Sequence, residues 1–247
     1  MIAWEEQELA DPELESLRVA LLFPKGRERT TESFLGLLRS GDTSAVCVAF
    51  DFYRHCEVMT RHGGENSLTV HKDEVLERAR GILASATAEE EHSVVALSVL
   101  GFLAGPQDTE LIRAALESAG TEEALIAAVR AADTILEAGG SDSTQAKSLT
   151  AAVARPAFDA NRSEAVRWLA LNAVAEGPPL LAQEYLLQAL ELPSITLQAV
   201  AGLALAQHDS TAHRPMLEAM VAGWPEDVDF PADRLLSLLE ETAGSGD

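Results

Sequence analysis

The sequence predicts an all-α protein made of many short helices. Apolar residues recur with helical spacing along most of the chain, and Gly and Pro interrupt this pattern at short intervals. The Val, Ile and Thr alternation that marks strands is only weakly present, at Ser67–Val70. The chain has 247 residues, and 47% of them are apolar, which is enough for a substantial core and too much for intrinsic disorder.

The first three helices are defined by their end signals. A helix is predicted over residues 11–22, because Asp11 suits an N-cap and Pro12 suits the first turn. Two more are predicted over residues 31–39 and 43–61, and each is followed by glycine.

After a polar loop the helices become more regular. Thr87–Glu90 has the pattern of a capping box. The connections are two to six residues long, so successive helices are expected to be antiparallel neighbours. The predicted ranges are 73–85, 89–104, 108–118, 122–138, 142–158, 163–175, 179–191, 194–207, 212–222 and 231–242.

These helices form pairs that repeat about every 31–40 residues, a period typical of stacked repeats. The second helix of four pairs is rich in small apolar residues on more than one face, which indicates burial on several sides. These stretches cover residues 94–100, 128–132, 165–174 and 197–204.

The second helices resemble those of the HEAT and HEAT-like repeat family. Residues 166–174 contain Val-Arg-x-x-Ala-x-x-Ala-Val, which is similar to the family pattern, and Val129-Arg130-x-x-Asp133 is a partial copy. Pro156 is similar to the proline of the kinked first helix in many repeats. The resemblance implies a right-handed α–α solenoid of about five to six helical pairs over residues 71–247. Residues 1–70 would form an irregular helical N-terminal cap, continuous with the repeats.

The net charge limits the classes of partner that this protein is expected to bind. The chain has 40 acidic and 18 basic residues, a net charge of −22. Residues 81–247 hold 25 of the acidic and 8 of the basic residues, so most of the negative field belongs to this part. Such a field repels nucleic acid and attracts basic protein surfaces. Two interpretations stay open: the acidity serves solubility alone, or it binds a basic protein partner.

Membrane and export signals are not found in the sequence. The longest nearly apolar run, residues 94–105, is shorter than the roughly 20 residues that a membrane span needs. The acidic start does not resemble a secretory signal. Cys47 and Cys56 lie nine residues apart on one predicted helix, about 13 Å along its axis and too far for a disulfide. We therefore expect a cytoplasmic protein that does not bind membranes.

Metal-binding and catalytic patterns are weak. His55, Cys56, Glu57, His62 and His71 are ligand types, but no pair has the spacing of a strong metal site. No His-Glu dipeptide occurs, which argues against the iron hydroxylases among HEAT-like proteins. We therefore expect no catalytic residue, no metal site and no cofactor. The alternative is a HEAT-like enzyme, or a small-molecule or metal binder, that uses the His-containing region 55–71.

A stripe of charged residues is the best candidate site. On the predicted helix 122–138, Arg130, Asp133 and Glu137 share one face. The family resemblance implies that second helices line a concave surface, so these residues would form a mostly acidic groove; an ordinary solvated face is the alternative. The predicted partner-binding residues are Glu122, Glu123, Arg130, Asp133, Glu137, Glu164, Arg167 and Asn172.

The sequence thus predicts a non-enzymatic protein–protein interaction module whose acidic surface binds a basic protein partner, of inhibitor, immunity or adaptor type. A structural subunit of a larger assembly is a further possibility. Trp168 is interpreted as a core residue, with a binding anchor as the alternative. The acidic stretch 225–229, between Trp224 and Phe230, is interpreted as a solvated loop, with a partner-facing loop as the alternative.

Overall fold

The computed structural model describes residues 5–23, 26–61, 67–85, 87–139, 143–225 and 227–243. All regular secondary structure in these ranges is helical, which confirms the predicted all-α class. Ser67–Val70, where strand-like alternation is only weakly present in the sequence, forms a turn that leads into a short 3₁₀ helix. A four-residue alternation without a partner strand would leave its backbone groups unpaired. Within the described ranges, no helix is long and apolar enough to cross a membrane.

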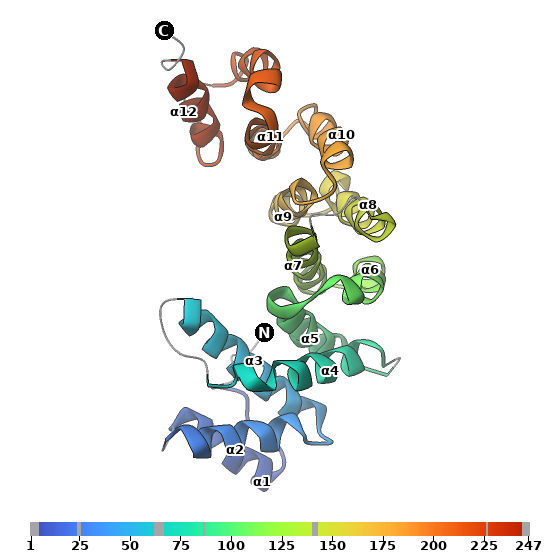
Figure 1. Cartoon of the computed structure of the whole chain (residues 1–247), viewed down its shortest axis with the longest axis vertical. Coiled ribbons are helices and arrows are strands. Elements are labelled where there is room, and N and C mark those ends of the chain that lie inside the picture. Colours follow the sequence, from blue (N-terminus) through green and yellow to red (C-terminus); the bar gives the residue numbers. More distant parts are fainter. Residues whose placement is uncertain are drawn as a thin grey trace. The chain divides into compact units, whose positions relative to one another are not determined.

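The chain divides into two compact units, Met1–Thr134 and Ile135–Asp247, called here the N-terminal and C-terminal units. The predicted division into a cap (1–70) and repeats (71–247) stays a prediction. Figure 1 labels the helices: α1 (Pro12–Leu22), α2 (Arg27–Leu38), α3 (Thr43–Arg61), η1 (Thr69–His71), α4 (Lys72–Leu83), α5 (Glu90–Leu103), η2 (Pro106–Asp108), α6 (Thr109–Ser118), α7 (Glu122–Gly139), α8 (Thr144–Phe158), α9 (Glu164–Ala175), α10 (Pro179–Ala189), α11 (Ile195–Val221) and α12 (Ala232–Ala243).

Local signals set several of these helix ends. The Asp11 carboxylate accepts hydrogen bonds from the backbone N–H groups of Glu13 and Leu14, as an N-cap does. α2 begins four residues earlier than predicted, because Gly26, at a φ of 117°, serves as its N-cap. The two predicted helices 194–207 and 212–222 form one element, α11, with a non-helical break at Asp209.

The N-terminal unit has a core centred on α2 and α3. α1 packs on α2, α2 packs on α3, and α3 and α4 both pack on α5. Phe34 of α2 is fully buried, and its ring lies 6.2 Å from that of Tyr53 on α3. Arg18 of α1 is also buried and donates to Glu15 and to the backbone carbonyl of Glu5. The hydrogen bonds from Arg18 lower the pKa of the Glu15 carboxyl to about 2.

A second core lies between α5 and the first part of α7. Val94 and Leu97 pack there against alanines of α7. Gly101 of α5 faces Arg130 of α7, and a Cβ on it would make an ordinary van der Waals contact, 3.7 Å from the Cβ of Arg130. The Thr134 hydroxyl donates to the Gly101 carbonyl at 2.8 Å. Since α4 also contacts α6, this part of the unit has α4 beside α6 and α5 beside α7.

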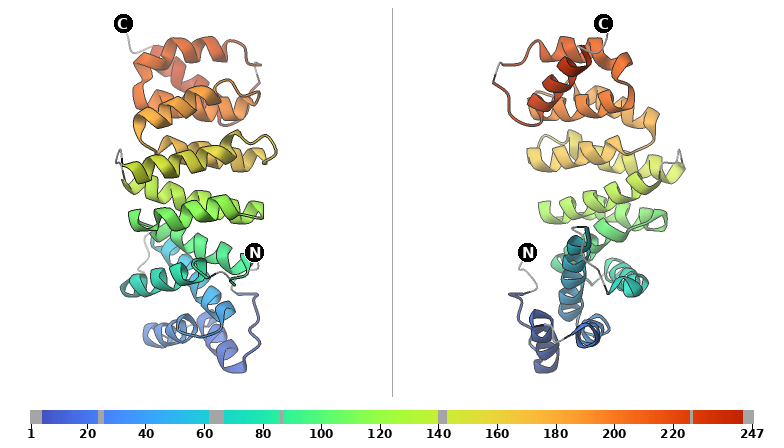
Figure 2. Two further views of the ribbon diagram at one scale, coloured as in Figure 1. Left: turned by 90° about the vertical axis from the view of Figure 1, so that its right-hand side faces the viewer. Right: turned by 60° about the vertical axis from the view of Figure 1, so that its left-hand side comes forward.

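The C-terminal unit consists of two successive helical pairs followed by α12. α8 packs on α9, and α10 packs on α11. Like helices of the two pairs also touch, because α8 contacts α10 and α9 contacts α11. Figure 2 shows the α8–α9 pair in yellow followed by the α10–α11 pair in orange. α12 packs on α11 around Leu217 and Leu235, which are fully buried.

Cys47 and Cys56 are both free thiols on α3. Burial, together with nearby carboxylates, raises the pKa of Cys47 to about 12 and that of Cys56 to about 11. A raised pKa keeps the thiol protonated and therefore a poor nucleophile.

We expect iodoacetamide to label Cys56 about 100-fold more slowly in the folded protein than in urea at pH 8, measured by intact mass. Labelling at equal rates in both conditions would contradict this burial.

Candidate protein-binding site

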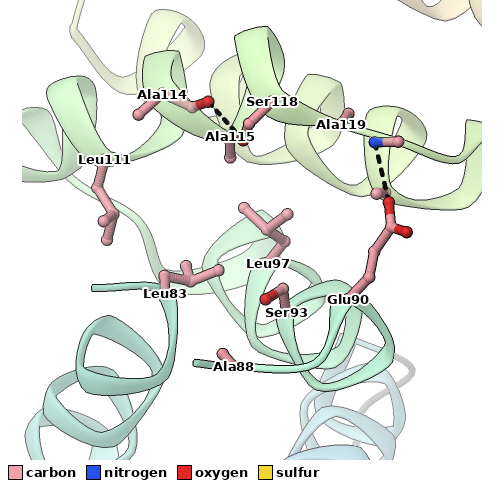
Figure 3. Close-up of a pocket in the computed structure, with 12 residues that line it drawn as sticks. Leu83, Ala88, Glu90, Ser93, Leu97, Leu111, Ala114, Ala115, Ser118 and Ala119 are labelled. Atoms are coloured by element: carbon pink, nitrogen blue, oxygen red, sulfur yellow. Dashed lines mark hydrogen bonds between the residues drawn. The ribbon is translucent and has the colours of Figure 1, made fainter. Parts of the chain in front are cut away.

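A groove with both polar and apolar lining residues lies in the N-terminal unit, between α5, α6 and the start of α7 (Figure 3). Its volume is about 390 Å³. Leu83 at the end of α4, Leu97 of α5 and Leu111 of α6 lie on its wall. The other apolar lining residues are alanines: Ala88, Ala114, Ala115, Ala119 and Ala124.

The groove exists because the facing side chains are small. Leu97 and Ala124 line it and also belong to the buried core between α5 and α7. Ala115 of α6 and Ala119, just after the end of this helix, pack against this core but are only partly buried. Methyl groups at these positions leave a hollow that leucine-sized side chains would fill.

Glu90 fixes the loop between α6 and α7 at one end of the groove. Its Oε1 atom accepts hydrogen bonds from the backbone N–H groups of Gly120 and Thr121, each at 2.9 Å (Figure 3 shows a dashed contact from Glu90). The predicted capping box over Thr87–Glu90 is wrong. α5 begins at Glu90, its N-cap residue Glu89 makes no side-chain cap, and the Glu90 carboxylate serves the later loop instead.

Asp108 fixes the other end of α6. Its carboxylate is 2% exposed and pairs with the Arg80 guanidinium through two hydrogen bonds of 2.6 and 3.0 Å. It also accepts a hydrogen bond from the backbone N–H of Gly105. Arg80 lies three residues before Leu83, and Asp108 lies three residues before Leu111. The pair therefore ties α4 to the start of α6 beside the groove.

Exposed carboxylates lie in or next to the lining of the groove. Glu90 lines it and is exposed, whereas its sequence neighbours face other surroundings: Glu89 lines a separate hollow beside α3 and α4, and Glu91 lies near Cys47 of α3. Glu122 and Glu123 are exposed in the first turn of α7, between the lining residues Gly120 and Ala124. Glutamates grouped at a hollow concentrate a negative potential there. Glu90, Glu122 and Glu123 are called the acidic rim below.

The structure places the predicted partner-binding residues in different surroundings. Glu122 and Glu123 lie at the rim, whereas Arg130 is exposed and Asp133 is half-buried further along α7. Glu137 is exposed in the last turns of α7. That all eight residues share one surface stays a prediction.

On α9, two predicted residues have local structural roles. Glu164 accepts a hydrogen bond from the Ser194 hydroxyl at 2.6 Å, and the Arg167 Nε donates to the Ala157 carbonyl at 3.1 Å. Asn172 is exposed, and its amide donates to the Trp168 carbonyl within the helix. These contacts link α9 to its neighbours on both sides.

The sequence reasoning missed the groove and its rim residue Glu90. Glu90 belongs to a run of three glutamates directly before a strongly apolar helix, and this run was available as a signal. The alanines of α6 gave no such signal, because a helical pattern of alanines does not show whether each one packs against a neighbouring helix or lines a hollow.

The alternative site at residues 55–71 is described only in part. His55 is exposed on α3, and the His71 ring lies 6.3 Å from the Phe34 ring. His62 lies outside the described residues. No group of three His, Cys, Asp or Glu side chains that could hold a metal ion is found in the part that the structure describes.

Trp168 and Trp224, which the sequence analysis singled out, are both half-buried. Trp168 lies on α9, where it is neither fully buried nor a prominent surface anchor. The Trp224 indole donates to the Gln198 side chain at 2.8 Å.

The fold and the site define an all-helical protein with a groove that has an acidic rim. A scan against protein-family models and searches of curated proteins and of solved structures found no match to this chain.

Proposed function

We propose that this protein is a non-enzymatic interaction module that binds a basic protein partner, with the groove and its acidic rim as the binding site. The observation that supports this most is a hollow of about 390 Å³ that is walled by leucine, alanine and serine, with the exposed Glu90 in its lining and the exposed Glu122 and Glu123 next to its lining residues in sequence. It suits a partner segment that presents an apolar side chain between lysines or arginines. The inhibitor, immunity and adaptor types are roles that such a site would serve.

Apolar burial and charge would affect different rate constants of partner binding. Full burial of one leucine-sized side chain is worth about 1.5–3 kcal/mol and mainly slows dissociation. The rim carboxylates attract a cationic partner over distance and mainly speed association. The net charge of −22 adds to this long-range attraction.

The proposal includes a HEAT-like solenoid as the scaffold. Two packing patterns support it: α4 beside α6 with α5 beside α7 in the N-terminal unit, and α8 beside α10 with α9 beside α11 in the C-terminal unit. Stacked helical pairs are expected to produce such rows of like helices.

The test separates the charge of the rim from the shape of the groove. The immobilised protein would capture basic proteins from a lysate of its source organism, and association and dissociation rates would then be measured with each captured protein. Glu122→Lys with Glu123→Lys should lower the association rate at low salt about tenfold. Asp73→Lys with Asp233→Lys is the matched control, because both residues are exposed in the first turns of other helices.

Filling the groove gives the second arm of the test. Ala114 is an exposed lining residue, so Ala114→Trp should occupy the hollow and raise the dissociation rate at least about tenfold. Ala219→Trp, on an exposed part of α11, is the control. If both tryptophan variants bind like the wild type, the groove is not the site. If both charge variants weaken binding equally, only net charge matters.

A further inference from the structure

A second hollow of the N-terminal unit lies beside α3 and α4 and is called the α3–α4 pocket. Its volume is about 650 Å³, which is in the range of ligand sites. Its walls come from the start of α3, the last turns of α4, the connection after α4 and the first turn of α5. Ala88, labelled in Figure 3, lines both this pocket and the groove, so the two hollows adjoin at the connection between α4 and α5.

Two carboxylates in the lining of the α3–α4 pocket are available to a ligand. Glu77 of α4 and Glu89, the N-cap residue of α5, line the pocket, and both are exposed. Neither carboxylate makes a hydrogen bond or an ion pair with another residue in the part of the chain that the structure describes. Nearby glutamates differ in this respect, because Glu74 pairs with Arg39 at 2.6 Å and Glu90 binds the loop between α6 and α7.

The basic side chains in this lining are directed at other parts of the protein. The Nε and Nη2 atoms of Arg78 donate to the carbonyl oxygens of Leu38 and Ser40, at the C-terminal end of α2. The Nε2 atom of His92 lies 3.4 Å from the Ser44 hydroxyl oxygen. The two carboxylates therefore dominate the charge that a ligand would meet, and they favour a cation.

The helix ends at the α3–α4 pocket favour a cation as well. The Asp42 carboxylate accepts hydrogen bonds from the backbone N–H groups of Ser44 and Ala45, so a negative side chain already occupies the N-terminus of α3. Gly81 and Ile82 bring the C-terminal end of α4 into the wall. The C-terminus of a helix carries a negative partial charge, which attracts cations.

The rest of the lining suits an arginine side chain. Val46 is 1% exposed and Ile82 is half-buried, and together they offer apolar surface to a methylene stem. The hydroxyl oxygens of Thr43, Ser85 and Thr87 also line the pocket and can accept hydrogen bonds. A guanidinium has five N–H donors in a planar fork and can use several such acceptors at once.

We propose that the basic partner binds with two neighbouring side chains, of which an apolar one enters the groove and an arginine enters the α3–α4 pocket. The backbone of the partner would cross the connection between α4 and α5 at Ala88. Because the two hollows adjoin there, the two side chains would come from residues close in sequence. This inference rests on the proposed function, since it takes the groove as one half of the site.

Synthetic peptides that carry both side chains test the proposal. They are acetylated and amidated chains of glycine and serine with one leucine and one arginine, separated by one, two or three residues. Titrations of the isotope-labelled full chain, followed by NMR, give the dissociation constants. The peptide with the best spacing should bind at least about tenfold tighter than peptides with leucine alone or arginine alone, because the second contact then forms within one complex. The arginine should shift the amide signals of Val46 and Thr87, and the leucine those of Ala114 and Ala115.

Charge variants identify the groups that hold the arginine. Glu77→Gln with Glu89→Gln should weaken the best peptide at least about fivefold and leave the leucine-alone peptide unchanged. Glu28→Gln with Glu184→Gln is the matched control, because it removes the same charge from exposed residues of α2 and α10 that line neither hollow. At about 0.15 M salt this control should bind like the wild type, since distant charges are largely screened.

Three results would overturn the proposal. The first is a leucine–arginine peptide that binds no tighter than the leucine-alone peptide at every spacing. The second is a Glu77→Gln, Glu89→Gln variant that binds the best peptide like the wild type. The third is spermidine that binds the pocket more tightly than this peptide, which would assign the pocket to a free polyamine. In each case, a leucine-alone peptide that binds the wild type but not Ala114→Trp would leave the proposed function intact, whereas equal binding to both would count against the groove itself.

Discussion

Replacing Asp108 with alanine is expected to lower the free energy of unfolding by about 3 kcal/mol. The carboxylate is 2% exposed, and it pairs with Arg80 through two hydrogen bonds. Its removal also leaves the Gly105 N–H without its carboxylate acceptor. Breaking a buried pair costs about 3–5 kcal/mol, and the lower end applies because Arg80 is 34% exposed and water can reach it. Urea unfolding followed by circular dichroism would measure this loss.

An ion pair on the same helix provides the comparison. Glu110→Ala removes one partner of Arg113, but the Glu110 side chain is 65% exposed, and Arg113 keeps Glu117. Surface pairs of this kind contribute little, so the urea midpoint should hardly move. If both variants lost the same free energy of unfolding, the burial of Asp108 would not add to the cost of removing its carboxylate.

The Asp108 variant should also affect the groove. Asp108 holds the start of α6, whose Leu111, Ala114 and Ala115 line the hollow. If α6 loosens, a partner bound in the groove should dissociate faster even at temperatures where the chain remains folded. The same variant therefore connects the stability of α6 to the proposed function.

Helix positions in this chain could be predicted because their signals are local. The Asp11-Pro12 cap and the range of α3, Thr43–Arg61, agree with the structure. The break at Asp209 was located only roughly, because the chain continues as helix on both sides of a single non-helical residue. No sequence spacing indicates such a one-residue interruption.

The candidate site was harder to predict because its partners are distant in sequence. Glu90 was interpreted as part of a local cap, but the N–H groups that it binds lie 30 and 31 residues later. Asp108 pairs with a residue 28 positions earlier. Glu122 and Glu123 were predicted as binding residues from charge alone, and the structure places them beside an unpredicted hollow. The charge on a helix surface can therefore be predicted from the sequence, whereas the shape of a neighbouring hollow depends on how the helices pack.

Replacing Gly177 with alanine is expected to lower the free energy of unfolding by about 2 kcal/mol. A Cβ at this position would lie 2.5 Å from the Thr150 Oγ1 atom and 3.0 Å from the Val174 carbonyl oxygen. Thr150 is fully buried, and its hydroxyl donates to the Ala146 carbonyl, so this side chain cannot move away freely. The backbone of α9 would have to shift instead. Thermal and urea unfolding would give the change.

Two further variants show whether this close contact is the cause. Gly81→Ala is the matched control, because Gly81 is exposed within α4 and a Cβ on it would touch nothing within 4 Å. It should gain about 0.5–1 kcal/mol, since alanine is a better helix former than glycine. Thr150→Ala removes both atoms of the Thr150 side chain that crowd Gly177. In that background Gly177→Ala should cost at least about 1 kcal/mol less than in the wild type. An unchanged cost would place the strain at the Val174 carbonyl, and therefore in the backbone at the end of α9 rather than in the packing of α8 against it.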